Sequence, residues 1–192
     1  MNKLEQSEKE QIAFSGKIIE VIKKPMKKGD KIVEFEIARR APGVRLIIVK
    51  ENKILLSKEF RYELDDYDYR LPGGKAFDTL REYREALRSE KDLIGEAAKA
   101  AEKECLEETG LKPKKVNHFY TAGSGGPTIK WDLYYFVVND FEENKNGQNL
   151  EIGEIIKPEW KTFEEAKQLC FENKVHEDRT VSVLLKYFNK EE

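Results

Sequence analysis

The sequence predicts a single α+β domain with mixed sheets, preceded by a pair of N-terminal strands. Three observations support this class. The length of 192 residues suits one domain, 39% of the residues are hydrophobic, and short apolar runs alternate with a few helical segments. The longest apolar runs, Val44–Val49 and Leu133–Val138, suit buried strands and fall far below the ~18 residues of a membrane span.

Strands dominate the first part of the chain. The β-branched segments Ile12–Val21 and Ile32–Ile37 flank Lys24–Asp30, which contains a proline and a glycine, so this region predicts a hairpin. After a Pro-Gly turn, Val44–Val49 forms a strand. A polar turn then leads into the next strand, Ile54–Ser57.

Helical and strand segments alternate in the second part. Thr79–Thr109 has the composition of a helix and carries two apolar stripes at helical spacing. Gly110 follows at the position where a helix C-terminus favours glycine. We expect strands at Val116–Tyr120 and Trp131–Val138, and a polar loop at Asp140–Gly153.

Two helices complete the chain. Thr162 and Glu165, three residues apart, form a capping box for a helix that runs to about Asn173. The last helix begins near Asp178 and turns apolar side chains such as Leu184 inward. With the strands, these helices give the α+β pattern.

The charge distribution excludes several classes of protein. The 35 Lys and Arg residues are interspersed with 37 Asp and Glu, so no basic field predicts nucleic-acid binding and no basic helix predicts membrane binding. Cys105 and Cys170 form no CxxC pattern, which argues against a zinc site. Two free thiols, and a charged Met1–Gln11 without a signal-peptide core, predict a cytoplasmic protein.

A cluster of glutamates is the part of the sequence that most clearly indicates a chemical function. Glu104, Glu107 and Glu108 share one face of the predicted helix, beside the apolar stripe that ends at Cys105. Carboxylate oxygens in such a cluster suit Mg²⁺, which is bound by a few carboxylates together with substrate phosphates. The spacing alone also fits a solvated acidic face.

The segments Lys103–Leu111 and Leu71–Lys75 together resemble the Nudix box, whose pattern is G-x5-E-x7-R-E-U-x-E-E-x-G-U with U an apolar residue. The resemblance implies a Nudix-type α/β/α sandwich around a mixed sheet. Lys103 replaces the arginine of the pattern, and Gly95 falls where its first glutamate should be, with Glu96 one residue away. An insertion within Phe77–Leu93 is expected to add a helix.

Other segments resemble the ADP-ribose pyrophosphatase branch of this family. Phe14–Lys17 resembles its N-terminal strands, which implies a homodimer with residues 1–40 as the dimerisation element and 41–192 as the Nudix domain. Glu59–Tyr62 resembles the Q-Y-R motif of the branch, and Pro127 lies where the branch carries a proline after the box.

The resemblance also implies roles for individual residues. The carboxylates of Glu104, Glu107 and Glu108 and the carbonyl of Gly73 would bind Mg²⁺ or Mn²⁺. Such an ion polarises phosphoryl oxygens and lowers the pKa of a water, and Glu107 thereby takes part in catalysis. A general base would come from the polar loop, with Glu154 the first candidate and Glu151 the alternative.

The substrate side is implied in the same way. Arg61, together with Arg39 or Arg40, would contact a phosphate, and Pro127 would lie at the substrate site. Arg61 alone also fits a surface ion pair with a nearby Asp.

The implied reaction is hydrolysis of a nucleoside diphosphate linked to another moiety, a small-molecule substrate such as ADP-ribose, which yields AMP and ribose 5-phosphate. Two alternatives stay open. One is a Nudix hydrolase for another nucleotide, because the insertion lies beside the site. The other is a nucleotide-binding sensor without activity, suggested by Gly95 and Lys103.

Overall fold

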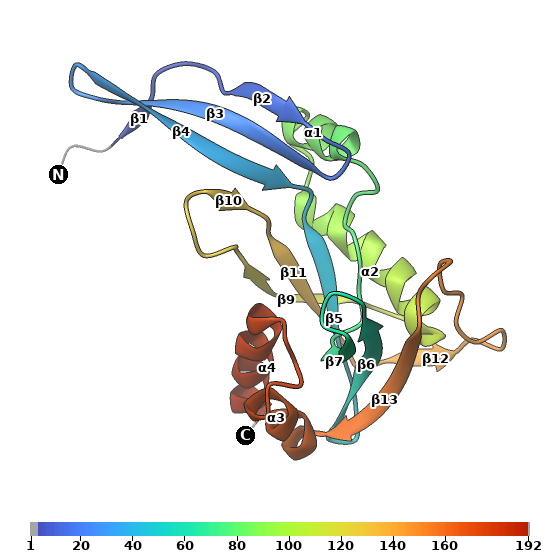
Figure 1. The fold of residues 1–192 in the computed structure, drawn as a ribbon. Helices are drawn as coiled ribbons and strands as arrows, with labels where there is room; N and C mark the ends of the chain where they lie inside the picture. Colours follow the sequence, from blue (N-terminus) through green and yellow to red (C-terminus); the bar gives the residue numbers. More distant parts are fainter. Residues whose placement is uncertain (1–3, 192) are drawn as a thin grey trace.

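A six-stranded mixed sheet forms the centre of the computed structural model, which describes residues 4–191 (Figure 1). Its strand order is β13-β6-β5-β11-β9, and β7 pairs with β6. The strands are β5 (Gly43–Lys50), β6 (Lys53–Arg61), β7 (Asp66–Arg70), β9 (Asn117–Ala122), β11 (Leu133–Val138) and β13 (Ile156–Thr162). Only β5 and β11 run parallel within this described sheet.

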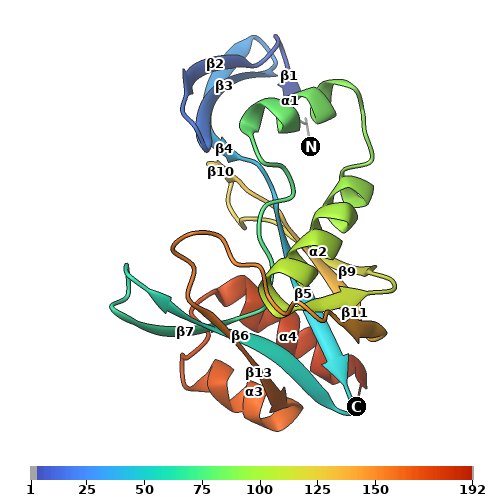
Figure 2. The same cartoon turned by 90° about the vertical axis from the view of Figure 1, so that its right-hand side faces the viewer.

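Helices cover both faces of the central sheet (Figure 2). On one face, α2 (Leu93–Thr109) packs Ala97 and Ala101 against Leu46 of β5. On the other, α3 (Phe163–Phe171) and α4 (Asp178–Glu191) bury a core that includes Ile47, Ile54, Leu184 and Phe188. Neighbouring residues of β5 therefore point into different cores, which is the alternation of a two-sided strand. The predicted α/β/α sandwich is confirmed.

A second sheet precedes the sandwich in the chain. It consists of β1 (Glu5–Gln6), β2 (Gln11–Ser15), β3 (Ile19–Lys28), β4 (Lys31–Arg40) and the short β10 (Ile129–Lys130). The predicted hairpin is present, but the segment Ile12–Val21 is divided between β2 and β3, which pair with each other, and the hairpin turn is tighter than expected. Pairing continues to Lys28 and Lys31, so only Gly29 and Asp30 turn the chain, and Gly29 has a positive φ of 61°.

The insertion forms the helix α1 (Leu80–Arg88), as expected. The predicted segment Thr79–Thr109 is therefore two helices, because Asp92 caps a new helix at Leu93. In both views α1 lies beside the N-terminal sheet, and the Arg84 side chain on α1 forms a 3.3 Å ion pair with Glu20 on β3 (Figures 1 and 2).

The last two helices follow the sequence closely, whereas the strands β7 and β13 are not predicted by the sequence analysis. The capping box of Thr162 and Glu165 is present, although α3 ends at Phe171, and α4 begins at Asp178. The polar loop holds a short strand, β12 (Phe141–Glu143), which pairs with β8 (Leu111–Pro113) after α2. None of the described helices is long and apolar enough to cross a membrane.

Candidate active site

One cavity of about 280 Å³ brings together most of the predicted site residues. It is bordered by α2, the turn after β7, the strands β5 and β6 and the loop before β13. Its acidic side chains are Glu59, Asp78, Glu104, Glu107, Glu108, Glu151 and Glu154, and its basic side chains are Arg40, Arg45, Arg61, Arg70, Lys75 and Lys103. Opposite charges on this scale suit a substrate that carries phosphates and needs a cation.

The Pro-Gly-Gly turn brings the backbone against α2. The Gly73 N–H donates to the Glu108 carboxylate at 2.7 Å, and Gly73 has a φ of 144°, which favours glycine. A Cβ at Gly74 would lie 2.0 Å from Oε1 of Glu104. Gly74 thus leaves room for the Glu104 carboxylate, whereas Gly73 is needed because a Cβ there would lie 2.2 Å from the Val44 carbonyl oxygen.

Burial and neighbouring negative charges make the ionised form of the α2 carboxylates Glu104 and Glu108 unfavourable. Burial raises the pKa of the Glu108 carboxyl to about 8, and the charges of Glu104 and Glu154 add to the shift, against the Gly73 N–H bond and Arg45. Burial, followed by the charge of Glu107, also raises the pKa of Glu104. A bound divalent cation would offset the repulsion between these carboxylates, which is the part of the pKa shifts that comes from neighbouring charges.

The donor types fit a hard divalent cation, but the side chains are not gathered around one point. Within residues 4–191, no three carboxylate, imidazole or thiolate groups are already arranged as a metal site. Glu107 faces Lys103 at 3.6 Å on the partly exposed side of α2. Side-chain rotation would have to bring Glu104, Glu107 and Glu108 together on an ion.

The loop before β13 is fastened to the end of α2. The Asn149 N–H donates to the Glu107 carbonyl at 2.8 Å, and the Gln148 amide donates to the Glu108 carbonyl. These bonds use carbonyls of the last helical turn, which have no partner inside the helix. The loop thereby holds Glu151 and Glu154 at the cavity, where the Glu154 carboxylate accepts from the Glu151 N–H at 2.9 Å.

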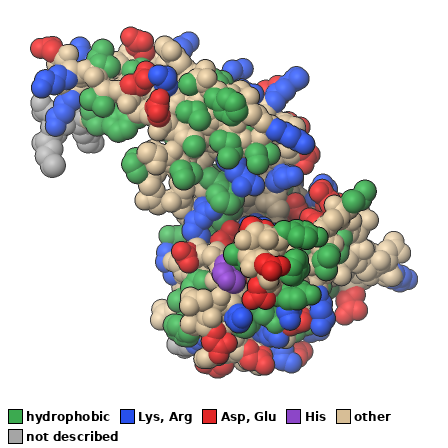
Figure 3. Space-filling view, viewed as in Figure 1, with side chains coloured by type: hydrophobic (Ala, Val, Ile, Leu, Met, Phe, Trp, Pro, Cys, Tyr) green, Lys and Arg blue, Asp and Glu red, His purple; other side chains and the backbone are tan. Residues whose placement is uncertain are grey.

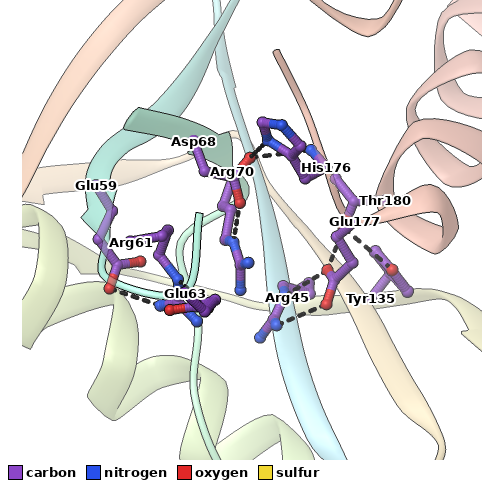
Figure 4. Close-up of polar contacts among 10 residues, drawn as sticks. All are labelled: Arg45, Glu59, Arg61, Glu63, Asp68, Arg70, Tyr135, His176, Glu177 and Thr180. Atoms are coloured by element: carbon purple, nitrogen blue, oxygen red, sulfur yellow. Dashed lines mark hydrogen bonds and ion pairs between the residues drawn. The ribbon is translucent and has the colours of Figure 1, made fainter. Parts of the chain in front are cut away.

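Three of the arginines at the cavity, Arg45, Arg61 and Arg70, are already paired with carboxylates (Figure 4). Arg45 is buried and donates through two nitrogens to both oxygens of Glu177, each at 2.9 Å. Arg61 contacts Glu59 at 2.8 Å and Glu63 at 3.0 Å. The ion pair expected as an alternative for Arg61 is thus present, with glutamates as partners.

The structure separates Arg39 from Arg40. Arg39 does not line the cavity, and its guanidinium is bound by the buried Glu20 at 2.6 Å and by Glu10. Arg40 lines the cavity, lies 4.5 Å from the ring centre of Trp131 and has no carboxylate partner among the described residues. Pro127 borders a different hollow, beside β4 and β10, and is not brought to this cavity.

Glu96 also lies outside the cavity. It sits in the first turn of α2, where its carboxylate pairs with Lys99 at 2.8 Å. A Cβ on Gly95 would lie 2.7 Å from the Asp92 carboxylate, the N-cap of this helix. Gly95 therefore lies in the first turn of α2, beside the side chain that caps the helix.

The sequence reasoning missed Arg45 and Arg70. Arg45 had a visible signal, because it is the one charged residue within the apolar run Val44–Val49. A charge inside a buried strand needs a partner, and that partner, Glu177, lies far along the chain. Arg70 lies two residues before the Pro-Gly-Gly turn, in which the sequence assigns a role only to a glycine.

Comparisons with known proteins agree with this fold. The chain matches the NUDIX domain family over residues 39–182. It is also similar to a solved crystal structure of an ADP compounds hydrolase, with a TM-score of 0.68 and 14% identity over 98% of this chain and 95% of that chain, which shows a shared fold. No curated protein matches. Because the NUDIX match covers most of its length, the chain belongs to the Nudix family, as its sequence predicts.

Proposed function

We propose that this Nudix hydrolase of nucleoside diphosphate derivatives acts on ADP-ribose and releases AMP and ribose 5-phosphate. The observation that carries the proposal is the single cavity with carboxylates on α2 and arginines on the sheet. A diphosphate fits both groups, since it binds cations and guanidinium groups alike.

Glu104, Glu107, Glu108 and the carbonyl of Gly73 would hold the divalent cation, Mg²⁺ or Mn²⁺. A bound cation neutralises phosphoryl charge and makes a water more acidic. The raised pKa values of Glu104 and Glu108 support this assignment, because they report carboxylates that are withdrawn from water and lie close to other negative charges.

Glu154 is the favoured general base, ahead of Glu151. Its charge reaches both Glu104 and Glu108 and raises their pKa values, which supports a position beside the reacting phosphate. Its role is to accept a proton from the attacking water. The tethered loop would present it to the substrate.

Arg40 is the favoured phosphate contact of the two neighbouring arginines. Its guanidinium has no carboxylate partner among residues 4–191, whereas Arg39 is held by Glu20. Arg61 could bind phosphate only by exchanging Glu59 or Glu63 for the substrate. The role of Pro127 rests on the family resemblance alone.

A product assay tests the proposal. Purified protein is incubated with ADP-ribose and Mg²⁺, Mn²⁺ or a chelator, and AMP and ribose 5-phosphate are measured. We expect AMP only with a metal. A panel of other nucleoside diphosphate sugars and nucleoside triphosphates identifies a different substrate if ADP-ribose is not cleaved.

A sensor without activity is the second candidate. The observations that favour it are the position of Glu96 outside the cavity and the side chain of Lys103, which replaces an arginine. Tight ADP-ribose binding with no turnover at any metal concentration would establish this alternative and reject hydrolysis.

We also propose a cytoplasmic homodimer that associates through the N-terminal sheet. Phe14, Ile32 and Val33 on this sheet are 59%, 60% and 49% exposed, and Figure 3 shows hydrophobic side chains among the charges there. Light scattering should give twice the mass of one chain. Deleting Met1–Asp30 should give monomer or aggregate, and a soluble active dimer after deletion would contradict the proposal.

A further inference from the structure

Two polar side chains at the cavity have no part in the function proposed above. Ser57 on β6 and Arg70 on β7 are direct partners in the antiparallel register, so their side chains lie on the same face of the hairpin. Both line the cavity that contains the α2 carboxylates.

Ser57 has an unused hydroxyl. The residue is 3% exposed, and its Oγ is buried with no hydrogen-bond partner among the described residues. Leaving a buried hydroxyl without a partner is unfavourable, and most such groups in native proteins are paired. A ligand in the cavity could supply the missing partner.

Arg70 is held in place by one end of its guanidinium. Its Nε donates to Asp68, a fully buried carboxylate whose other oxygen accepts from the His176 N–H at 2.9 Å and lies 3.2 Å from the imidazole Nδ1 (Figure 4). The terminal nitrogens of Arg70 form no hydrogen bond or ion pair with a described residue, although the charge of Arg70 acts on Glu63 and Glu177. Arg70 thus differs from Arg61, whose Nε and Nη1 both donate to glutamates.

We propose that Ser57 and Arg70 form an oxyanion subsite that binds a phosphoryl group of the substrate. The proposal rests on the diphosphate substrate class proposed above. The free guanidinium nitrogens and the serine hydroxyl are donors, and together they match the several acceptor oxygens of a phosphoryl group. Because Asp68 fixes Arg70 before the ligand arrives, little side-chain entropy is lost on binding.

Calorimetric titration of the metal-depleted full-length protein with inorganic pyrophosphate tests the subsite without requiring turnover. We expect Arg70→Gln to weaken binding on the order of 10- to 100-fold, as for loss of a charged hydrogen-bonding group. The matched control is Arg81→Gln, which removes an exposed arginine that also pairs with a carboxylate, Glu85 at 3.0 Å. This control should bind like the unchanged protein.

Ser57→Ala keeps folding effects apart from binding effects, because it leaves the pair of Arg70 and Asp68 intact. We expect pyrophosphate binding to weaken about 3- to 10-fold while the melting temperature stays equal or rises, since an unpaired buried hydroxyl is removed. A residue with a structural role alone would not give this combination.

Three results would overturn the subsite: no binding of pyrophosphate by the unchanged protein, unchanged binding by Arg70→Gln, or unchanged binding by Ser57→Ala. Failure of the proposed function appears in a different measurement, as no release of AMP from ADP-ribose in the presence of Mg²⁺ or Mn²⁺.

Discussion

The acidic and basic sides of the cavity are built in opposite ways. The acidic side is centred on one short stretch of α2 that supplies Glu104, Glu107 and Glu108, where burial and like charges raise the pKa of Glu104 and Glu108. The basic side comes from separate strands, and its buried arginine, Arg45, has its own carboxylate partner in Glu177.

The two sides therefore differ in function. The α2 carboxylates can bind a cation, whereas the Arg45–Glu177 pair stabilises the fold. On α2 the buried carboxyl of Glu108 holds a proton more readily than usual, which is a cost that a bound cation removes. Arg45 is neutralised inside the protein and stays fixed with or without a ligand. Substitutions on the acidic side should therefore affect activity, and substitutions on the basic side should affect stability.

The largest expected effect is on activity, from the acidic side. Glu107→Gln and Glu108→Gln should each lower kcat/KM for ADP-ribose about 10³-fold, because a neutral amide cannot balance a divalent cation. The free energy of unfolding of the metal-free protein should change little or rise. The control is Glu102→Gln, an exposed residue on the same helix. Unchanged activity in both variants would reject the metal assignment.

The next effect is on stability, from the basic side. Glu177→Gln should lower the free energy of unfolding by about 3 kcal/mol, because it leaves the buried Arg45 without a charged partner. Denaturant unfolding measures the change. Glu164→Gln, in which an exposed ion pair with Lys167 is lost, should cost less than about 0.5 kcal/mol. Equal costs in the two variants would show that the Arg45 pair contributes no more than a surface pair.

The raised pKa of Glu108 on α2 also predicts a pH dependence for the metal-free protein. Glu108 titrates near pH 8 in the folded state against an ordinary value of 4.5, so the folded state binds the additional proton between these values. Stability should therefore fall as the pH rises, by about 2 kcal/mol between pH 6 and pH 8. Glu108→Gln should flatten this slope. A metal-free protein that is more stable at pH 8 than at pH 6 would contradict the prediction.

The same contrast explains what the sequence could predict. The sandwich, the Nudix family and the class of enzyme follow from the sequence and are confirmed, because the Pro-Gly-Gly turn and the α2 glutamates are local patterns. The arginine side was only partly predictable. The partners of Arg45 and Arg70 are Glu177, Asp68 and, through Asp68, His176, and two of these lie over a hundred residues away.

Two neighbouring arginines show most clearly what could not be predicted from the sequence. Arg39 and Arg40 were equivalent from the sequence, yet the alternation of a strand sends one toward Glu20 and the other toward Trp131. The sequence predicts a longer hairpin turn than the structure has, because proline is typical of turns. In the structure Pro25 remains in β3, and its carbonyl accepts from the Ser7 N–H.

The smallest expected effect concerns Glu96, which tests how far the acidic side extends along α2. The carboxylate pairs with Lys99 and does not line the cavity, so Glu96→Gln should leave kcat/KM within about twofold and stability within about 0.5 kcal/mol. Steady-state kinetics with Mg²⁺ provide the measurement. A tenfold loss would mean that Glu96 supports the cation after all, and that the acidic side begins a full two turns before Glu104.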